Sequence, residues 1–563
     1  MYKRKILNIA PINLELQEEL TKALKISKIM ANILINRGIK DIEEAERFLN
    51  PKLNYLLSSY LFSEMPKAVN LIKKAVKDKF KVMIFGDYDA DGLTSLAILK
   101  ETLSRMGLEV IYYLPHRIKE GYGLNRNIIE FAKQKNVKVL ITADCGTNDY
   151  EQIEQLRKDN IEVIITDHHQ PKDETRPSTA SAILNPKLKE SGYPYKDLAG
   201  VGVVYKFCQA LSEEDLFDKL ELVCLGTVAD AVPLLSENRV MVKEGLLRLA
   251  QTNHPGLKAL KKKSRLKNMR LDTESISYIL GPRINASGRL DTAQTSLDLL
   301  LSQDEEEADR LAERLELYNR QRQKIENQIL EEAHSLIEKE INFNEDKVIV
   351  LAKENWHQGV LGIVASKIVD RFHRPAIVIS KTPGLCRGSG RSIKNFHLFQ
   401  ALLECKEFLS TFGGHSHAAG LLIAEDKIFD FKDTINRLAN EWLSGEDLIP
   451  SLDIDMEIKL SDLNESLAKE LESLQPYGVG NPQVLFYTRG LSLKSKPQIL
   501  GKDTIKLWVT DGMVTYPAIG FGMECLNTYL LNADSLDLVY TVGLDVWEDR
   551  TDLLLEIKEI FFR

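Results

Sequence analysis

The chain has 563 residues, of which 44% are hydrophobic and 28% charged, and its 74 basic and 82 acidic side chains give a net charge of −8. This length exceeds what one hydrophobic core supports, and the composition is that of a globular protein. No run of about 18 uncharged apolar residues occurs, and the N-terminus lacks the apolar segment of a secretory signal. The six cysteines form no Cys-x-x-Cys pair, so we expect reduced thiols in a cytoplasmic protein with no membrane partner.

Taken alone, the negative net charge argues against a protein that binds nucleic acid. One run, residues 261–270, nevertheless holds six basic side chains and no acidic one. A basic run is most often a solvated face, so this segment only weakly favours nucleic-acid binding.

Residues 1–50 have the pattern of helices, and we interpret them as a packing extension that contributes no chemistry. In the next segment, 51–300, short apolar runs alternate with helical patterns, which predicts βαβ units and a parallel sheet. The predicted strands cover residues 81–86, 109–114, 138–143 and 162–166.

Acidic and imidazole side chains follow three of these predicted strands. Strand by strand, they are Asp87 and Asp89, then Asp144, then Asp167, His168 and His169. Because ligands collect beyond the carboxyl ends of parallel strands, we expect these side chains to share one edge of the sheet.

The stretch Asp-Tyr-Asp-Ala-Asp-Gly (87–92) places three aspartates at alternate positions. Their charges repel unless a cation neutralises them, which favours a hard divalent metal; an ordinary turn is the alternative. Asp230 lies in an apolar run, where an unpaired charge is costly. A salt bridge or a helix cap would also explain Asp230, but together with the strand ends it completes a cage of carboxylates and imidazoles.

Four motifs carry a resemblance to a known family: Asp-Tyr-Asp-Ala-Asp-Gly (87–92), Ala-Asp-Cys-Gly-Thr (143–147), Thr-Asp-His-His (166–169) and Gly-Thr-Val-Ala-Asp (226–230). In this order they resemble the motifs of the DHH phosphoesterase superfamily. The fuller pattern, from about residue 45 onward, resembles its exonuclease branch, the RecJ family.

The resemblance implies two divalent cations, Mn²⁺ or Mg²⁺. The first would be held by Asp89, Asp144, His168 and Asp230, and the second by Asp87 and Asp144. His169 would face the substrate phosphate, and Asp91 would brace the turn. Many members with small substrates carry a metal-binding histidine four residues before the first aspartate; this chain has Met83 there, so the second ion is expected to be held more loosely.

Residues 280–293 place two arginines, Arg283 and Arg289, among small residues. Arginine forks suit phosphate oxygens, so we interpret this segment as a phosphate-binding loop, as in a similar RecJ motif; a structural turn is the alternative. Residues 301–342 follow as a long amphipathic helix that connects two domains, with a capping box of Ser302 and Glu305. Its predicted apolar stripe is Leu311, Leu315, Tyr318, Ile325, Ile329 and Leu336.

The predicted second domain, 343–445, begins with a buried strand and a glycine-flanked helix, whose N-terminus offers N–H groups to an anion. The segment 386–392 has the ingredients of a phosphate cradle. The glycine-rich segment 412–420 presents His415 and His417, which suit a phosphate better than a metal.

These features resemble the DHHA1 domain that accompanies the DHH domain. The resemblance implies that Ser389 and Arg391 bind a 5′-terminal phosphate, assisted by Arg117 and Arg283. A closed pocket beside the metals would admit only a strand end, which is a physical reason for exonuclease action.

From residue 450 to Arg563 the pattern changes to short strands with turn signals, which suggests a small β-barrel. The segment before residue 484 resembles the entry to the RecJ OB-fold domain. Lysines near Trp508 are suited to single-stranded DNA, although an ordinary barrel also carries surface lysines. Because the chain ends directly after this barrel, we expect the further C-terminal domain of some relatives to be absent.

The sequence therefore predicts an α/β protein in which a parallel-sheet DHH domain and a smaller α/β DHHA1 domain are joined by a long helix and followed by an OB-fold barrel. The function implied is a single-stranded-DNA-specific 5′→3′ exonuclease that releases mononucleotides in DNA repair and recombination, with a single-strand-binding protein as partner. One alternative is a DHH phosphodiesterase of short oligonucleotides or cyclic dinucleotides, which would lack the connector helix and barrel. Another is an inactive scaffold, which should have lost metal ligands.

Overall fold

A five-stranded parallel sheet carries the aspartate and histidine motifs. In this computed structural model, which describes residues 5–172, 179–266, 271–547 and 550–563, the strand order is β3-β2-β4-β5-β6. The four predicted strands are confirmed; the fifth, with only three residues, was not predicted. Their bounds are β2 Val82–Gly86, β3 Val110–Tyr113, β4 Val139–Ala143, β5 Glu162–Thr166 and β6 Ala182–Leu184.

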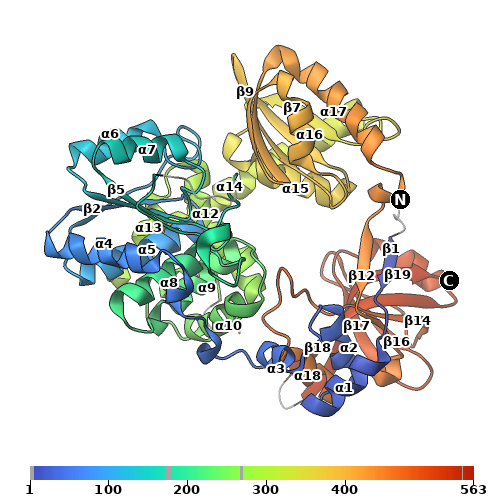
Figure 1. Ribbon diagram of the computed structural model, residues 1–563. Helices are drawn as coiled ribbons and strands as arrows, with labels where there is room; N and C mark the ends of the chain where they lie inside the picture. Colours follow the sequence, from blue (N-terminus) through green and yellow to red (C-terminus); the bar gives the residue numbers. More distant parts are fainter. Residues whose placement is uncertain (1–4, 173–178, 267–270, 548–549) are drawn as a thin grey trace. The chain divides into compact units, whose positions relative to one another are not determined.

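Helices cover both faces of this sheet, so its central strands are buried and read as continuous apolar runs. In Figure 1, α6 and α7 lie on one face, and α4, α5 and α8 lie on the other. All the strands run in the same direction, so the motifs that follow β2, β4 and β5 meet at one edge. The helix bounds are α4 Met65–Lys77, α5 Ala90–Arg105, α6 Arg126–Gln134, α7 Tyr150–Lys158 and α8 Gly200–Ser212.

The next part of the chain is helical, and here one prediction is wrong. Residues 281–290 form a helix, α12, rather than a phosphate-binding loop, and a π-helical turn (Ser275–Leu280) leads into it. The glycines and Pro282 resemble turn signals, but the chain stays helical through them, and Pro282 directly follows the π-helical turn, where the regular α-helical hydrogen bonds are already interrupted. The other helices here are α9 Leu220–Ala229, α10 Ser236–Ala250, α11 Pro255–Lys263 and α13 Gln294–Leu301.

The basic run at 261–270 is largely neutralised where the structure describes it. Lys262 Nζ lies 2.7 Å from Asp309, and Lys263 pairs with Glu313, both on the following long helix. Residues 267–270 of the run lie outside the described residues. The described part of this run therefore gives no support for nucleic-acid binding.

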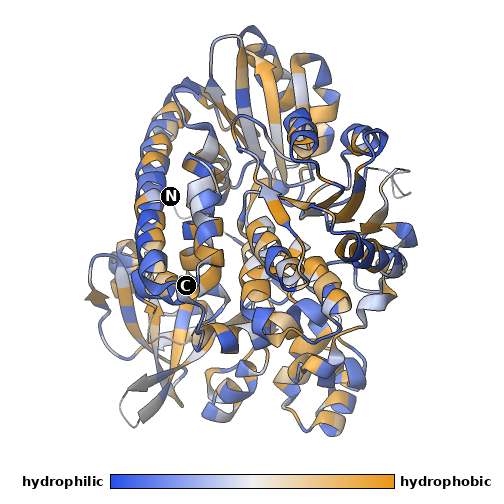
Figure 2. Ribbon diagram, turned by 90° about the vertical axis from the view of Figure 1, so that its left-hand side faces the viewer, coloured by the Kyte–Doolittle hydropathy of each residue, from blue (hydrophilic) through white to orange (hydrophobic). Residues whose placement is uncertain are grey.

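The predicted connector helix is α14, Glu305–Glu340. Its N-cap is Asp304, whose side chain accepts the N–H of Glu307 at 2.7 Å, so the predicted capping box of Ser302 and Glu305 is wrong. In Figure 2 this is the longest helix, and apolar residues alternate with long hydrophilic stretches. The buried stripe shares Leu315 and Ile329 with the prediction but also contains the polar residues Asn319, Arg322 and Glu326.

The second α/β domain has a mixed five-stranded sheet with the order β10-β11-β9-β8-β7, in which only β7 and β8 pair in parallel. The predicted phosphate cradle at 386–392 is largely the strand β9. The strands are β7 Ile349–Glu354, β8 Ala376–Lys381, β9 Leu385–Arg391, β10 Leu409–Gly414 and β11 Ala418–Ala424. The helices are α15 Leu361–Phe372, α16 Leu398–Glu404 and α17 Ile428–Trp442.

The C-terminal strands form a barrel because β14 pairs with both β18 and β16, which closes the sheet. The N-terminal helices share its hydrophobic core, and residues 6–9 form a strand, β1, instead of the predicted helix. The elements are β1 Ile6–Ile9, α1 Leu14–Leu24, α2 Lys28–Asn36, α3 Ile42–Leu49, β12 Ser451–Ile454, β13 Met456–Glu457, α18 Glu465–Glu472, β14 Phe486–Leu493, β15 Gln498–Leu500, β16 Thr504–Thr510, β17 Thr515–Gly520, α19 Asn527–Asn532, β18 Leu536–Trp547 and β19 Arg550–Phe562.

The chain divides into two units: residues 58–230 with 245–450, and residues 5–57 with 231–244 and 451–563. The predicted domain boundaries stay predictions. In the second unit, the fully buried Arg239 fastens the N-terminal segment to the barrel through five main-chain carbonyls: those of Phe48, Ser473, Leu474, Gln475 and Pro476. Within the described residues, no helix combines the length and the apolar character that crossing a membrane requires.

Candidate metal centre and anion site

The turn between β2 and α5 is shaped by Asp89 and Gly92. Asp89 is the N-cap of α5, and its Oδ1 accepts the N–H groups of Asp91 at 3.1 Å and Gly92 at 3.2 Å. A Cβ at Gly92 would lie 2.6 Å from the carbonyl oxygen of Asp87, so only glycine fits there. The turn therefore fixes the carboxyl groups of Asp87 and Asp89 at the edge of the sheet.

Asp91 does not brace this turn, which corrects the prediction. Its two carboxylate oxygens accept the N–H groups of Gly200 at 2.8 Å and Val201 at 2.7 Å, at the start of α8. A carboxylate at a helix N-terminus satisfies free donors and complements the helix dipole. Asp91 thus joins α5 to α8, and Asp89 has the role in the turn.

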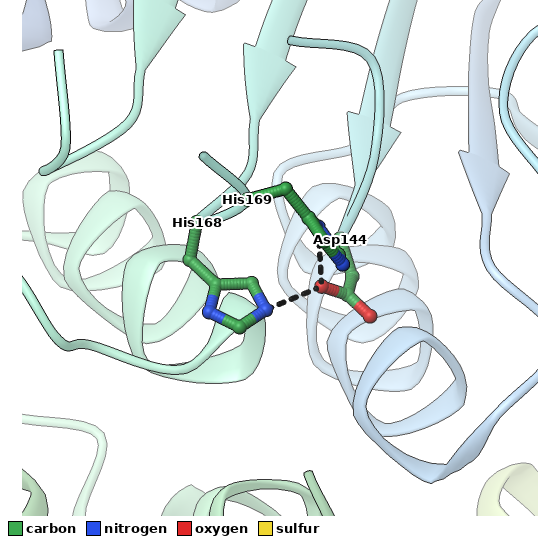
Figure 3. Close-up of side chains that lie close together, drawn as sticks. All are labelled: Asp144, His168 and His169. Carbon is green, nitrogen blue, oxygen red and sulfur yellow. Dashed lines mark ion pairs between the residues drawn. The ribbon is translucent and has the colours of Figure 1, made fainter. Parts of the chain in front are cut away.

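Asp144, directly after β4, is held close to both histidines. Its φ is 66°, in the left-handed region that residues other than glycine rarely adopt. Its Oδ1 lies 3.2 Å from Nε2 of His168 and 3.8 Å from Nδ1 of His169, as the dashed lines in Figure 3 show. A Cβ at Gly200 would lie 2.5 Å from this same oxygen, so α8 also confines the carboxylate.

His168 connects Asp144 to the end of α9. Its Nε2 lies 3.4 Å from Oδ2 of Asp230, the residue that caps α9, and 3.8 Å from Oδ2 of Asp91. Three groups of side chains have ligand atoms within 4.8 Å of one another: Asp144 with His168 and His169, Asp91 with His168 and Asp230, and Asp87 with Asp89 and Asp144. The structure therefore brings together the five predicted metal ligands and His169. Asp89 groups with Asp87, whereas the resemblance assigns it to the other ion.

The carboxyl groups of this centre are hard to ionise without a cation. Burial, reinforced by Asp89, raises the pKa of Asp87 to about 8, and burial together with the neighbouring carboxylates raises the pKa of Asp144 and Asp230 well above the usual range. Burial also lowers the pKa of His168 to about 3, so its imidazole is neutral and available as a ligand.

His169 is oriented by Asp167, a residue that the sequence places in the motif but to which we assigned no role. Asp167 Oδ1 lies 2.8 Å from His169 Nδ1, and it also accepts the main-chain N–H of both histidines. Burial alone would lower the pKa of His169, but the charge of Asp167 overrides it and raises the pKa to about 9. The hydroxyl of Tyr122, which no sequence pattern singled out, lies 3.0 Å from the same Nδ1.

The donor set fits a divalent cation that accepts both oxygen and imidazole ligands, such as Mn²⁺ or Mg²⁺. Buried Oδ1 atoms of Asp87 and Asp144 and the Nε2 of His168 have no hydrogen-bond partner among the described residues. Buried acceptors without donors are costly, and a cation would satisfy them. Met83, by contrast, is fully buried in the apolar core beneath α6 and α7, so its side chain belongs to that core.

A second group of charges, all positive, adjoins the carboxylates. Ser389 and Arg391, two apart on β9, share one face of the strand, and both lie against the first turn of α15. Arg391 Nη2 and Ser389 Oγ would be 3.0 Å and 3.1 Å from a Cβ at Gly362. We call Ser389, Arg391, Arg117 and Arg289, together with the α15 N-terminus, the anion site.

Electrostatic coupling connects the arginines of the anion site. Burial, reinforced by the charges of neighbouring arginines that include Arg117 and Arg391, lowers the pKa of Arg289 to about 9. Arg289 Nη1 also donates to the carbonyl of Gly359, directly before α15. Like charges gathered in this way favour a bound anion.

Arg283 and His415, which were also predicted to bind phosphate, are not part of the anion site. Arg283 donates to Glu316 on α14 at 2.8 Å and to the carbonyl of Ile279, so it is held by the connector helix. His415 lies in the turn between β10 and β11, where its side chain is largely exposed. Partial desolvation of the imidazole and the charges of His169 and Lys187 lower its pKa. None of the metal-competent groups among the described residues contains His415 or His417.

Three domain families match this chain: the DHH family N-terminal domain over residues 81–227, the DHHA1 domain over 345–441 and the RecJ OB domain over 454–559. The single-stranded-DNA-specific exonuclease RecJ of Escherichia coli is 34% identical, over 97% of this chain and 98% of its own length. The protein of the same name from Bacillus subtilis is 35% identical, over 96% of this chain and 69% of its own. The chain belongs to the RecJ family.

The fold agrees with this membership. The crystal structure of RecJ from Thermus thermophilus in complex with Mn²⁺ superposes with a TM-score of 0.84 at 26% identity, covering 100% of this chain and 80% of that one. A second structure, exonuclease RecJ bound to manganese, has a TM-score of 0.60 at 31% identity and covers 69% of this chain and 97% of that one. The predicted fold class and family are confirmed, and the roles of single residues remain predictions.

Proposed function

We propose that this chain is a single-stranded-DNA-specific 5′→3′ exonuclease that releases mononucleotides by hydrolysis with two divalent cations. The observation that carries the proposal is the pairing of a carboxylate and imidazole cluster with an adjoining group of arginines. The two are close enough for Arg117 to lower the pKa of Asp87, against the larger effect of burial. Membership of the RecJ family supplies the substrate class.

The cations would be held by the residues of the metal centre. One set is His168, Asp144 and Asp230, and the other is Asp87, Asp89 and Asp144. When bound, two such ions lower the pKa of a water molecule and neutralise charge on the scissile phosphate. His169, whose pKa Asp167 raises, would face that phosphate and donate a hydrogen bond to it.

The anion site accounts for action at a strand end. A terminal phosphate monoester carries about two negative charges at neutral pH, since its second pKa is near 6, whereas a phosphate within the strand carries one. Three arginines that share one site bind a phosphate with this additional charge more strongly. A terminal phosphate held beside the metal centre would place the first phosphodiester bond at the metals, which favours release of one nucleotide at a time.

The alternative function, a phosphodiesterase of short oligonucleotides or cyclic dinucleotides, is less well supported. The chain contains the long helix α14 and, in its second unit, a match to the RecJ OB domain, and a short substrate needs neither. An inactive scaffold is disfavoured because every predicted ligand is present and grouped.

The test is digestion of single-stranded DNA labelled at one end, with Mn²⁺ or with EDTA. We expect labelled mononucleotide at once from the 5′-labelled strand, and stepwise shortening of the 3′-labelled strand. Cleavage of duplex DNA at an equal rate, or activity that survives EDTA, would reject the proposal. The variant Arg391→Ala should reduce the preference for a 5′-phosphate over a 5′-hydroxyl end, and an unchanged preference would remove Arg391 from the site.

We further propose that the enzyme works in the cytoplasm, in DNA repair and recombination, together with a single-strand-binding protein. Family membership supports this proposal, since such proteins coat the substrate that this enzyme would degrade. Calorimetric titration of the two purified proteins should show a complex, and no heat of binding at micromolar concentrations would reject the partner.

A further inference from the structure

Tyr88 lies between Asp87 and Asp89, and its side chain has no part in the chemistry described above. The guanidinium carbon of Arg117 lies 4.8 Å from the centre of the Tyr88 ring, which is the geometry of a cation–π contact. We infer that Tyr88 is a positioning residue that holds Arg117 in the anion site and thereby joins recognition of the terminal phosphate to the metal-binding turn. The inference rests on the function proposed above and names one of its specificity determinants.

Arg117 needs such a support. It is part of the segment that follows β3, and within the described residues its guanidinium makes no ion pair. Two other arginines, Arg289 and Arg391, repel its charge, and the carboxyl of Asp87, whose pKa it lowers, attracts it. A long flexible side chain among like charges is held in place by the face of an aromatic ring, which attracts a cation without neutralising it. Arg117 therefore keeps its full charge for an anion.

The main chain of Tyr88 is itself packed against α12. A Cβ at Gly288 would lie 2.8 Å from the carbonyl oxygen of Tyr88 and 3.7 Å from its Cβ, so the helix backbone rests directly on this residue. Two residues further on, the N–H of Ala90 donates to Oδ1 of Asn285 at 2.8 Å. The main chain of Tyr88 is therefore fixed by α12, and its ring lies against Arg117.

The consequence is a fixed spacing between two sites. The residues on either side of Tyr88 supply carboxylates to the metal centre, and its ring supports an arginine of the anion site. A terminal phosphate bound by Arg117 is thereby held at a set distance from the bond to be cleaved. This arrangement would make the position of the first cut depend on Tyr88, through its contact with Arg117.

The experiment measures end recognition without turnover. The affinities of a 5′-phosphorylated oligothymidylate and of its 5′-hydroxyl counterpart are compared in EDTA, so that hydrolysis does not interfere, and their ratio is the phosphate preference. The variants are Tyr88→Phe, which keeps the ring face, Tyr88→Leu, which removes it, and Arg117→Leu, alone and combined with Tyr88→Leu. Thermal unfolding reports whether each variant is folded, and calorimetry measures Mn²⁺ binding.

We expect Tyr88→Phe to keep the wild-type phosphate preference within about twofold and Tyr88→Leu to reduce it by about 5- to 30-fold, the range of a desolvated cation–π contact. In the Arg117→Leu background, Tyr88→Leu should change the ratio no further. Mn²⁺ affinity should stay at the wild-type value. If Tyr88→Leu does not fold, pentafluorophenylalanine is placed at position 88 instead. Its ring is similar in shape to that of phenylalanine, but the partial charge of the ring face is positive instead of negative. The same reduction in phosphate preference is expected.

Three results of the DNA-binding measurements would overturn the inference: equal losses for both strand ends, a loss in Tyr88→Phe as large as in Tyr88→Leu, or a full additional loss in the Arg117→Leu background. A reduced Mn²⁺ affinity of Tyr88→Leu would do the same, since the ring would then act on the metal centre. A wild-type protein that binds both ends equally well would instead reject the end recognition proposed above, and the inference with it.

Discussion

Gly362, in the first turn of α15, is where the anion site can be blocked with little disturbance of the fold. A methyl group there would lie 3.0 Å from Nη2 of Arg391 and 3.1 Å from Oγ of Ser389. These contacts are tight, yet both involve the ends of side chains that can move, and no backbone atom is among them. Gly362→Ala should therefore displace the two side chains of the site and leave the helix in place.

Gly362→Ala should have a small effect on the free energy of unfolding and a larger effect on the free energy of DNA binding. Alanine is favoured over glycine within a helix by about 0.5–1 kcal/mol. The displacement of two side chains offsets this gain, so the free energy of unfolding should change by less than about 1 kcal/mol. The loss of one hydrogen bond between an arginine and a phosphate costs about 1.5–3 kcal/mol, which weakens binding of a phosphorylated end about 10- to 150-fold.

The assay compares the affinity of 5′-phosphorylated and 5′-hydroxyl oligothymidylate for wild type, for Gly362→Ala and for the control Gly445→Ala. Gly445 has helical φ of −63°, and a Cβ there would meet nothing within 4 Å, so the control tests a glycine-to-alanine change in open space. We expect the phosphorylated end alone to bind more weakly, and only in Gly362→Ala. Unchanged binding of that end would show that Ser389 and Arg391 do not receive the phosphate.

Three further predictions concern the metal centre and the second unit. Asp144→Asn, which tolerates the left-handed backbone at this position, should abolish DNA hydrolysis and leave DNA binding within about threefold; retained turnover would exclude Asp144 as an essential ligand. Addition of Mn²⁺ at about 100 times its dissociation constant should stabilise the metal-free wild type by about 2.7 kcal/mol per site, seen as a higher midpoint of thermal unfolding, and Asp144→Asn should respond less. Arg239→Leu would remove one donor from each of five carbonyls, of which those of Leu474 and Pro476 still accept from Asn481, at about 1–3 kcal/mol for each that stays unsatisfied. It should lower the unfolding midpoint, and an unchanged midpoint would contradict the role of Arg239.

The sequence was sufficient for the metal centre because the residues involved follow local rules. Asp87 and Asp144 come directly after a short apolar strand and His168 two residues after one, and a parallel sheet necessarily brings such positions to one edge. The strand ends, the connector helix and the barrel are likewise signalled by patterns within a few residues. Family resemblance added the ion assignments, which no local pattern contains.

Partners that are distant in the sequence could not be predicted. Asp91 looks like one more turn residue, and only the placement of α8 shows that it caps that helix from 109 residues away. Arg322 looks solvated, yet it is buried in α14 and pairs with Glu326, which also binds Lys367 on α15. Arg239 likewise lies in a helix whose pattern gives no sign of its role. In each case a tertiary contact decides where the side chain lies, and it overrides the local preference of that residue type. The spacing of residues along the chain carries no information about that contact.

The error at Arg283 has a geometric cause that also explains the organisation of the site. Once residues 281–290 form a helix, Arg283 and Arg289 are six positions apart and point about 120° away from each other. They cannot serve one phosphate, and Arg283 turns to Glu316 on α14 instead.

Asn285, Gly288 and Arg289, at spacings of three and four, share the other face of α12. Asn285 receives the N–H of Ala90 in the metal-binding turn, Gly288 rests on the carbonyl of Tyr88, and Arg289 reaches the anion site. One helix face therefore carries a contact to each site. Because α12 sets their separation, a change of its register by one residue would alter the position of the cut as well as the affinity for the end.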